Sequence, residues 1–245
     1  MSTLVELIPR ALEEEVAEAA AVEVSAEEPS PAKAAAWSLA SFAGEQMRGL
    51  VQRVFLTGRD KRVRQVVFAP VDQETDVASL CMLVGEVLSR QDSGTTCVVE
   101  ALPCPSAEHV SEDNDIAPPY SQKRFGVLRD ASQQLSSRLW FMARNVLLDG
   151  NDGKFSALWL RSRLAELRLE FDYTVLQGPA AGMHSEAALL GSLCDGVVLV
   201  LRANSTRRVA AQRVKEMLHT ANARVLGTVL SERTFPIPES IYKRL

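Results

Sequence analysis

Residues 196–201 read Gly-Val-Val-Leu-Val-Leu, an apolar run that is typical of a strand buried on both faces of a parallel sheet. Other short apolar runs have the same character and are predicted strands: 66–68, 97–99, 174–176 and 225–230, with a further candidate at 139–142. Segments with helical spacing of apolar residues lie between them. Because strands alternate with helices, the sequence predicts an α/β fold: a doubly wound, mostly parallel sheet with helices on both faces.

The helices of this fold are expected where apolar residues recur every three to four positions. The predicted ranges are 43–55, 77–88, 155–169, 185–193 and 209–221. A proline-rich, charged stretch at 103–122 predicts a surface loop. Residues 1–36 are rich in Ala and Glu and predict an acidic tail, with one short amphipathic helix at about 9–21 and a linker after it. The α/β domain is therefore expected to span 37–245.

The charge is unevenly spread along the 245 residues, whose net charge is −4. Residues 1–45 hold nine acids and two bases, a net −7, whereas the remaining chain is +3. A body so close to neutral gives no support for nucleic acid as a partner. No stretch reaches about 18 consecutive apolar residues and no basic, apolar leader opens the chain, so a cytoplasmic protein is expected.

The cysteines predict reduced thiols rather than a metal or redox centre. Cys81, Cys97, Cys104 and Cys194 form no CxxC pair, and none has a histidine at metal-ligand spacing. No metal site is expected.

Several landmarks in the C-terminal half occur in a recognisable order. They are Phe171-Asp172-Tyr173, the run from Asp195 to Val200 followed by Arg202, Thr206-Arg207-Arg208, and Leu226-Gly227-Thr228-Val229-Leu230. Over about residues 40–245 the chain resembles the bacterial tyrosine kinases of exopolysaccharide synthesis, which are part of the wider MinD/ParA-like group of P-loop ATPases. The resemblance implies a P-loop NTPase-like fold and places a phosphate-binding loop after the strand at 66–68.

That loop should be rich in glycine and end in Lys-Thr or Lys-Ser, because glycine lets backbone N–H groups approach the phosphates and lysine neutralises their charge. Alignment of the family pattern with Asp72–Ser79 puts Glu74 and Asp76 at the glycine positions. Val77 replaces the lysine, and Ala78 replaces the residue whose hydroxyl binds magnesium. Each carboxylate–phosphate pair at about 4 Å would cost on the order of 4 kcal/mol at an effective dielectric constant of about 20.

The two other catalytic elements of the family are altered as well. The family's second strand ends in Asp-x-Asp, where this chain has Glu100, Ala101 and Leu102. Its third element ends in an Asp that holds the magnesium water shell, where this chain has the neutral Gln177. The sequence therefore predicts a degenerate nucleotide pocket without catalytic, cofactor-binding or metal-binding residues, made of Asp72, Glu74, Asp76, Val77, Ala78, Ser79, Glu100 and Gln177.

The leading hypothesis is a catalytically inactive ATPase-like or tyrosine-kinase-like protein that needs no cofactor and serves as a regulatory or scaffold subunit in exopolysaccharide biosynthesis and export. The alternative is a divergent but active ATPase or protein tyrosine kinase of the same pathway, which would use Mg-ATP. A third option, a partner-positioning protein of the MinD/ParA type, calls for a basic amphipathic helix, whereas the helix at 9–21 is acidic.

The resemblance also implies partners. They would be proteins of a polysaccharide synthesis and export complex, including a membrane chain-length-determinant protein that could bring the chain to the membrane. The segment with Glu45 and Arg48 resembles the helix through which family members oligomerise, although Val51 stands at its third charged position.

The basic residues Arg59, Lys61, Arg62 and Arg64 form either a solvated loop or a contact for an acidic partner or anionic lipid. Tyr242 is a lone tyrosine where active members carry a tyrosine-rich tail.

Overall fold

The computed structural model describes residues 39–56, 62–92, 94–101, 128–148 and 157–232. The predictions for the tail, for its helix at 9–21, for the loop at 103–122 and for Tyr242 lie outside these residues. The division into a tail at 1–36 and a domain at 37–245 therefore stays a prediction.

The described residues form one seven-stranded sheet in the order β3-β4-β2-β5-β1-β6-β7. The strands are β1 Gln65–Pro70, β2 Thr96–Glu100, β3 Gln133–Ser136, β4 Leu139–Met142, β5 Tyr173–Gln177, β6 Gly196–Arg202 and β7 Val225–Ser231. All neighbouring pairs are parallel except β3 and β4, which form an antiparallel hairpin. The predicted strands and the mostly parallel sheet are confirmed. The sequence did not indicate β3, because this edge strand is exposed along its whole length and carries no apolar pattern.

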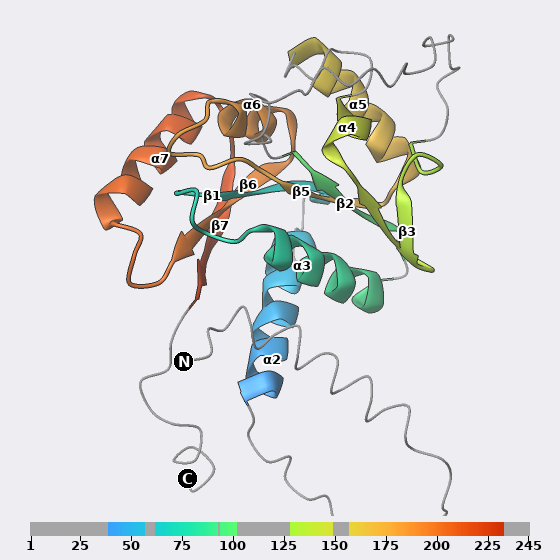
Figure 1. The fold of residues 1–245 in the computed structure, drawn as a ribbon, viewed down its shortest axis with the longest axis horizontal. Coiled ribbons are helices and arrows are strands. Elements are labelled where there is room, and N and C mark those ends of the chain that lie inside the picture. Colours follow the sequence, from blue (N-terminus) through green and yellow to red (C-terminus); the bar gives the residue numbers. More distant parts are fainter. Residues whose placement is uncertain (1–38, 57–61, 93, 102–127, 149–156, 233–245) are drawn as a thin grey trace, which may run out of the picture.

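Helices cover both faces of the sheet, as predicted (Figure 1). They are α2 Leu39–Val51 with a π-helical turn at Gln52–Leu56, α3 Ala78–Gln91, α4 Arg144–Leu147, α5 Ala157–Glu170, α6 Glu186–Leu193 and α7 Arg208–Thr220. Figure 1 shows α4 to α7 on one side and α2 and α3 on the other. The helix predicted at 43–55 begins four residues earlier and ends as a π-turn. Among the described helices, none has the length and apolar character needed to cross a membrane.

The core consists of two apolar layers, one on each face of the sheet. Alternate residues of the central strand β1 feed them: Val67 and Ala69 pack in the layer under α5 to α7, and Val66 and Phe68 in the layer under α2 and α3. All four side chains are fully buried. A strand buried on both faces has no polar side to alternate with, which is why its sequence is continuously apolar.

A partly buried polar cluster ties the amino ends of β1 and β6 to α5. The Oδ2 atom of Asp195 accepts hydrogen bonds from the N–H groups of Arg64 and Gln65, at 2.8 and 2.9 Å. Its Oδ1 atom accepts a hydrogen bond from Arg168 Nη2 at 2.7 Å. Arg168 Nε also donates to Gln65 Oε1, and Gln65 Nε2 donates to the carbonyl oxygen of Leu164. Residues far apart in the sequence are thereby fixed at one edge of the sheet.

A matched pair of leucine substitutions tests the core assignment. Leu199 in β6 is 1% exposed, whereas Leu158 in α5 is 81% exposed. We expect Leu199→Ala to lower the free energy of unfolding by about 2–5 kcal/mol, because it leaves a cavity in the central sheet. Leu158→Ala should change it by less than about 0.5 kcal/mol. Urea denaturation measures both values, and similar losses for the two variants would contradict the sheet arrangement.

The Asp195 cluster predicts a specific loss of stability in acid. Burial alone would raise the pKa of the Asp195 carboxyl, but the hydrogen bonds from Arg168 and from two backbone amides outweigh it and lower this pKa. A lowered pKa contributes stability that is present above the unfolded-state pKa of about 3.9 and is lost as the pH falls through the folded-state value. Wild-type protein should therefore lose more unfolding free energy than Asp195→Asn between pH 5 and acid conditions.

Urea denaturation at several pH values checks this expectation. Asp130→Asn is the control, because Asp130 is exposed and no interaction of its side chain is seen among the described residues. If Asp195→Asn follows the wild-type pH profile, the Asp195 cluster does not contribute to acid stability.

Candidate functional site

Three strand ends that the sequence places at the predicted nucleotide pocket lie side by side. In the sheet, Gln177 at the end of β5 is opposite Phe68 in β1 on one side and Glu100 at the end of β2 on the other. The carboxyl edge of a parallel sheet is where α/β proteins bind ligands. The loop after β1 and the ends of β2 and β5 are thus brought together. Gln177 is buried, whereas Glu100 is half-buried.

The loop between β1 and α3, residues 71–77, is held by its neighbours from its first residue. The N–H of Val71 donates to the carbonyl oxygen of Val200 in β6, and the carbonyl oxygen of Val71 accepts from the N–H of Gly182. A side chain at Gly182 would meet that carbonyl oxygen at 2.6 Å, so this close approach requires glycine. The segment after β5 therefore packs directly against the loop.

Asp72 stabilises the loop through hydrogen bonds to its carboxylate. One of its carboxylate oxygens accepts a hydrogen bond from the hydroxyl of Thr75, at 2.5 Å, and the other accepts one from the hydroxyl of Thr206, at 2.8 Å. Thr206 Oγ1 in turn accepts the backbone N–H of Arg202. Asp72 therefore connects the loop after β1 to the turn after β6.

Asp76 occupies the amino end of α3. Its Oδ1 atom accepts hydrogen bonds from the N–H groups of Ala78 and Ser79, at 2.9 and 3.2 Å. These are amide groups that a helix leaves without intrahelical partners, and an aspartate that accepts them stabilises the helix. In P-loop proteins the same end of the helix receives a phosphate. Here a carboxylate of the chain itself stands at this anion site.

Arg202 at the end of β6 holds two glutamates. Its Nη1 atom is 2.8 Å from Glu74 Oε2, in the loop, and its Nε atom is 2.7 Å from Glu232 Oε2, just after β7. Glu232 has a backbone φ of 53°, an unusual conformation for a residue other than glycine or asparagine. Such strain persists only where surrounding contacts fix the backbone. The ion pair with Arg202 is one such contact.

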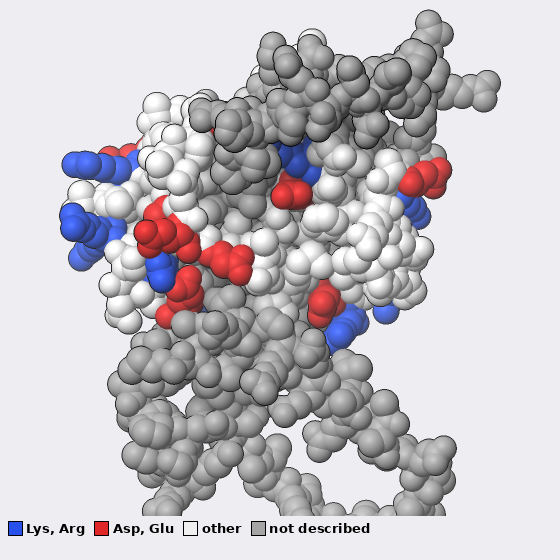
Figure 2. Space-filling view, viewed as in Figure 1, with Lys and Arg blue, Asp and Glu red and all other residues white. Residues whose placement is uncertain are grey.

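The sequence prediction missed Arg202, Thr206 and Glu232 as members of this site. Their position in the sequence could have identified two of them. Arg202 ends an apolar strand and Glu232 directly follows one, so both had to lie at the carboxyl edge. Figure 2 shows acidic side chains gathered around a basic group on the side where β6 and β7 end. Two carboxylates, those of Glu74 and Glu232, contact the guanidinium of Arg202, while Asp72 accepts hydrogen bonds from two threonine hydroxyls and Asp76 from two helix amides.

Val77 and Ala78, which stand where the family has its lysine and its magnesium-binding hydroxyl, have no group that could bind a phosphate or a metal. Val77, the last residue of the loop, is buried in the core layer under α2 and α3, and Ala78 is partly exposed at the start of α3. Leu102 lies outside the described residues. Within the part of the chain that the structure describes, no cluster of His, Cys, Asp or Glu has the arrangement of a metal site. The carboxylates of the loop are already bonded to Arg202, to two threonines and to helix amides. These bonds hold the loop in place.

Comparison with solved structures identifies the fold as that of P-loop NTPase-like proteins. The chimerical protein CapA2B2 aligns with 79% of this chain and 86% of its own, with a TM-score of 0.58 and 14% identity. The kinase domain of the Escherichia coli tyrosine kinase ETK aligns with 80% of this chain and 79% of its own, with a TM-score of 0.57 and 14% identity. At such identities the likeness concerns the fold.

Sequence comparison adds a resemblance to bacterial tyrosine kinases. The tyrosine-protein kinase CpsD of Streptococcus agalactiae is 34% identical over 62 residues, which are 25% of this chain and 27% of the kinase. YwqD of Bacillus subtilis is 28% identical over 76 residues, 31% of this chain and 32% of that kinase. The matches thus span about a quarter to a third of these kinases. No family model matches the chain. The resemblance to the bacterial tyrosine kinases that the motifs indicated is confirmed.

The bonding of Asp76 predicts a helix-capping role. We expect Asp76→Ala to lower the free energy of unfolding by about 0.5–2 kcal/mol, because two amides of α3 lose their acceptor. Asp76→Asn keeps an acceptor oxygen and should cost less. Asp130→Ala removes a carboxylate of the same kind from an exposed turn and is the control. Equal stability of Asp76→Ala and Asp130→Ala in urea denaturation would show that Asp76 is not a cap.

Proposed function

We propose that this protein is a catalytically inactive member of the tyrosine-kinase-like P-loop proteins that acts as a regulatory or scaffold subunit. One observation carries the proposal: the amides at the start of α3, to which a nucleotide phosphate would bind, are bonded to the Asp76 carboxylate. A phosphate at this place would have to displace a covalently tethered anion. The tethered group has a high effective concentration, so it competes well with a ligand from solution.

The charges around the loop support the same proposal. A triphosphate at the carboxyl edge would meet Asp72, Glu74 and Asp76, and Val77 offers no compensating charge where P-loop proteins have lysine. Arg202 is the cation that contacts the loop, and its guanidinium group is already paired with two glutamates. Two repulsive pairs of about 4 kcal/mol each would cancel a micromolar affinity, which corresponds to about 8 kcal/mol.

Metal binding is unsupported by the residues that would provide it. Gln177 at the end of β5 has a neutral amide in place of the carboxylate that holds magnesium water in the family, and Ala78 has no hydroxyl. Glu100 is the one carboxylate left on the strands of the predicted pocket. A single carboxylate is a weak magnesium site, because this ion is usually bound by carboxylates together with substrate phosphates.

The pathway and the partners follow from the resemblance to tyrosine kinases of polysaccharide synthesis. We infer a cytoplasmic protein that binds other proteins of a synthesis and export complex, among them a membrane chain-length-determinant protein.

Self-association through α2 is a further part of the proposal. Glu45 and Arg48 on that helix are exposed and pair with each other at 2.7 Å. Val51, at the family's third charged position, is fully buried and cannot contact a second copy.

Isothermal titration with Mg-ATP tests the proposal. We expect no binding at millimolar ATP for the wild-type protein, and no nucleotide-dependent rise in Tm. The single variant Val77→Lys should also fail to bind Mg-ATP, because Glu74, Asp76, Ala78 and Gln177 are unchanged. Val77→Arg is the matched charge control at the same position.

The result also decides between the two functions. A dissociation constant in the micromolar range for the wild type would overturn the inactive assignment. It would favour the divergent ATPase or tyrosine kinase, an alternative that the sequence match to CpsD and YwqD keeps open. Transfer of phosphate from labelled ATP to tyrosine would then separate the kinase from the ATPase.

A further inference from the structure

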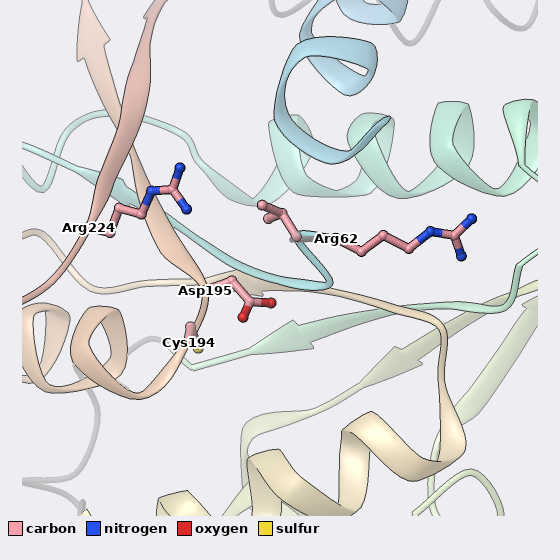
Figure 3. A pocket seen from close by; sticks show the side chains of 5 residues that line it. Arg62, Cys194, Asp195 and Arg224 are labelled. Atoms are coloured by element: carbon pink, nitrogen blue, oxygen red, sulfur yellow. The ribbon is translucent and has the colours of Figure 1, made fainter. Parts of the chain in front are cut away.

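A pocket of about 180 Å³ lies at the opposite, amino edge of the sheet, where Arg62, Val63, Cys194, Asp195 and Arg224 line it (Figure 3). These residues come from the segments that lead into β1, β6 and β7. The pocket is therefore separate from the loop after β1, which closes the carboxyl edge. Its inner wall is partly apolar, through Val63 and the Cys194 thiol.

The lining of this pocket holds two arginines and one carboxylate. Asp195 is its acid, and both oxygens of this carboxylate are bonded, one to two backbone amides and the other to Arg168. Arg62 and Arg224 are exposed and form no ion pair with any described residue. In Figure 3 neither guanidinium points toward Asp195, which lies between them in this view. The lining of the pocket thus includes two arginines whose guanidinium groups point away from Asp195, and its own carboxylate is bonded to Arg168.

The thiol in the wall does not oppose an anion. Burial is the main cause that raises the pKa of Cys194, to about 12, so the group stays neutral at physiological pH. A neutral thiol and a valine beside two guanidinium groups suit a ligand with a short hydrocarbon stem and a terminal anion. Arginine binds carboxylates through two parallel hydrogen bonds, and its long side chain can turn to meet a ligand.

We propose that this pocket is a docking site for an acidic protein segment, with a glutamate side chain inserted between Arg62 and Arg224. The methylene groups of the glutamate would lie against Val63 and Cys194, and its carboxylate would bind the two guanidinium groups. The site does not depend on whether the carboxyl edge binds nucleotide, because none of its lining residues belongs to that edge. It provides a contact through which a protein without ATP chemistry can hold a partner.

Fluorescence anisotropy with a labelled tetraglutamate peptide tests the site in the full-length protein. Arg62→Glu/Arg224→Glu should weaken binding at least tenfold, since two attractive contacts become repulsive. The control is Arg161→Glu/Arg213→Glu, which makes the same change of net charge at exposed arginines of α5 and α7. It should change the dissociation constant less than threefold. Arg62→Lys/Arg224→Lys keeps the charge but loses the bidentate geometry and should fall between the two.

Two further measurements make the outcome decisive. A tetraglutamine peptide should not bind, and inorganic phosphate should compete poorly with tetraglutamate, because phosphate lacks the apolar stem. Thermal unfolding of each variant shows whether it is folded. Equal loss in the control variant would mean that only net charge matters, and unchanged binding in Arg62→Glu/Arg224→Glu would mean that the pocket is not used; either result overturns the proposal. Effective competition by phosphate would also overturn it, in favour of an unselective anion site.

Discussion

The burial of β1 is the constraint on which the rest of the structure depends. This strand lies between β5 and β6, and both of its faces are covered by helices, so its backbone and side chains have no contact with solvent. The loop that follows a strand in that position must lie at the carboxyl edge, beside the ends of the neighbouring strands. The chain keeps this arrangement although the loop sequence departs from that of a phosphate-binding loop. The interactions that form the fold and those that bind phosphate are therefore separable.

The donors around the loop are bonded to acidic side chains of the chain itself. The amides of α3 and the guanidinium of Arg202 are donors that an anion could satisfy, and here the chain supplies the anions as Asp76, Glu74 and Glu232. In a nucleotide-binding loop, glycines and a lysine would leave these donors open until a phosphate arrives. In this loop the carboxylates of Asp76 and Glu74 bond to these donors, so the contacts that hold the loop come from the chain itself.

The fold was predictable from the sequence because its strongest signals come from buried strands, such as 196–201, whose pattern no surface requirement interrupts. The exposed strand β3 and the single-turn α4 were not predicted, since their residues carry no apolar period. For the candidate site, Asp72, Glu74 and Asp76 could be placed from alignment with a family pattern. The bonds they form could not, because Arg202 and Glu232 are 128 and 158 residues beyond Glu74 and only the sheet order brings them together.

The two edges of the sheet differ in charge, and this difference limits what each can bind. At the carboxyl edge, Asp72, Glu74 and Asp76 lie in the loop after β1, and Arg202 is paired with Glu74 and with Glu232 after β7. At the amino edge, Arg168 neutralises Asp195 and leaves the positive charges of Arg62 and Arg224 at the surface. Charges within about a Debye length, roughly 8 Å at physiological salt, steer an incoming ligand. Arg62 and Arg224 would steer an acidic partner of the proposed kind to the edge opposite the nucleotide site of related folds. Such a contact would leave the central sheet undisturbed, because none of the residues that line the pocket belongs to a strand.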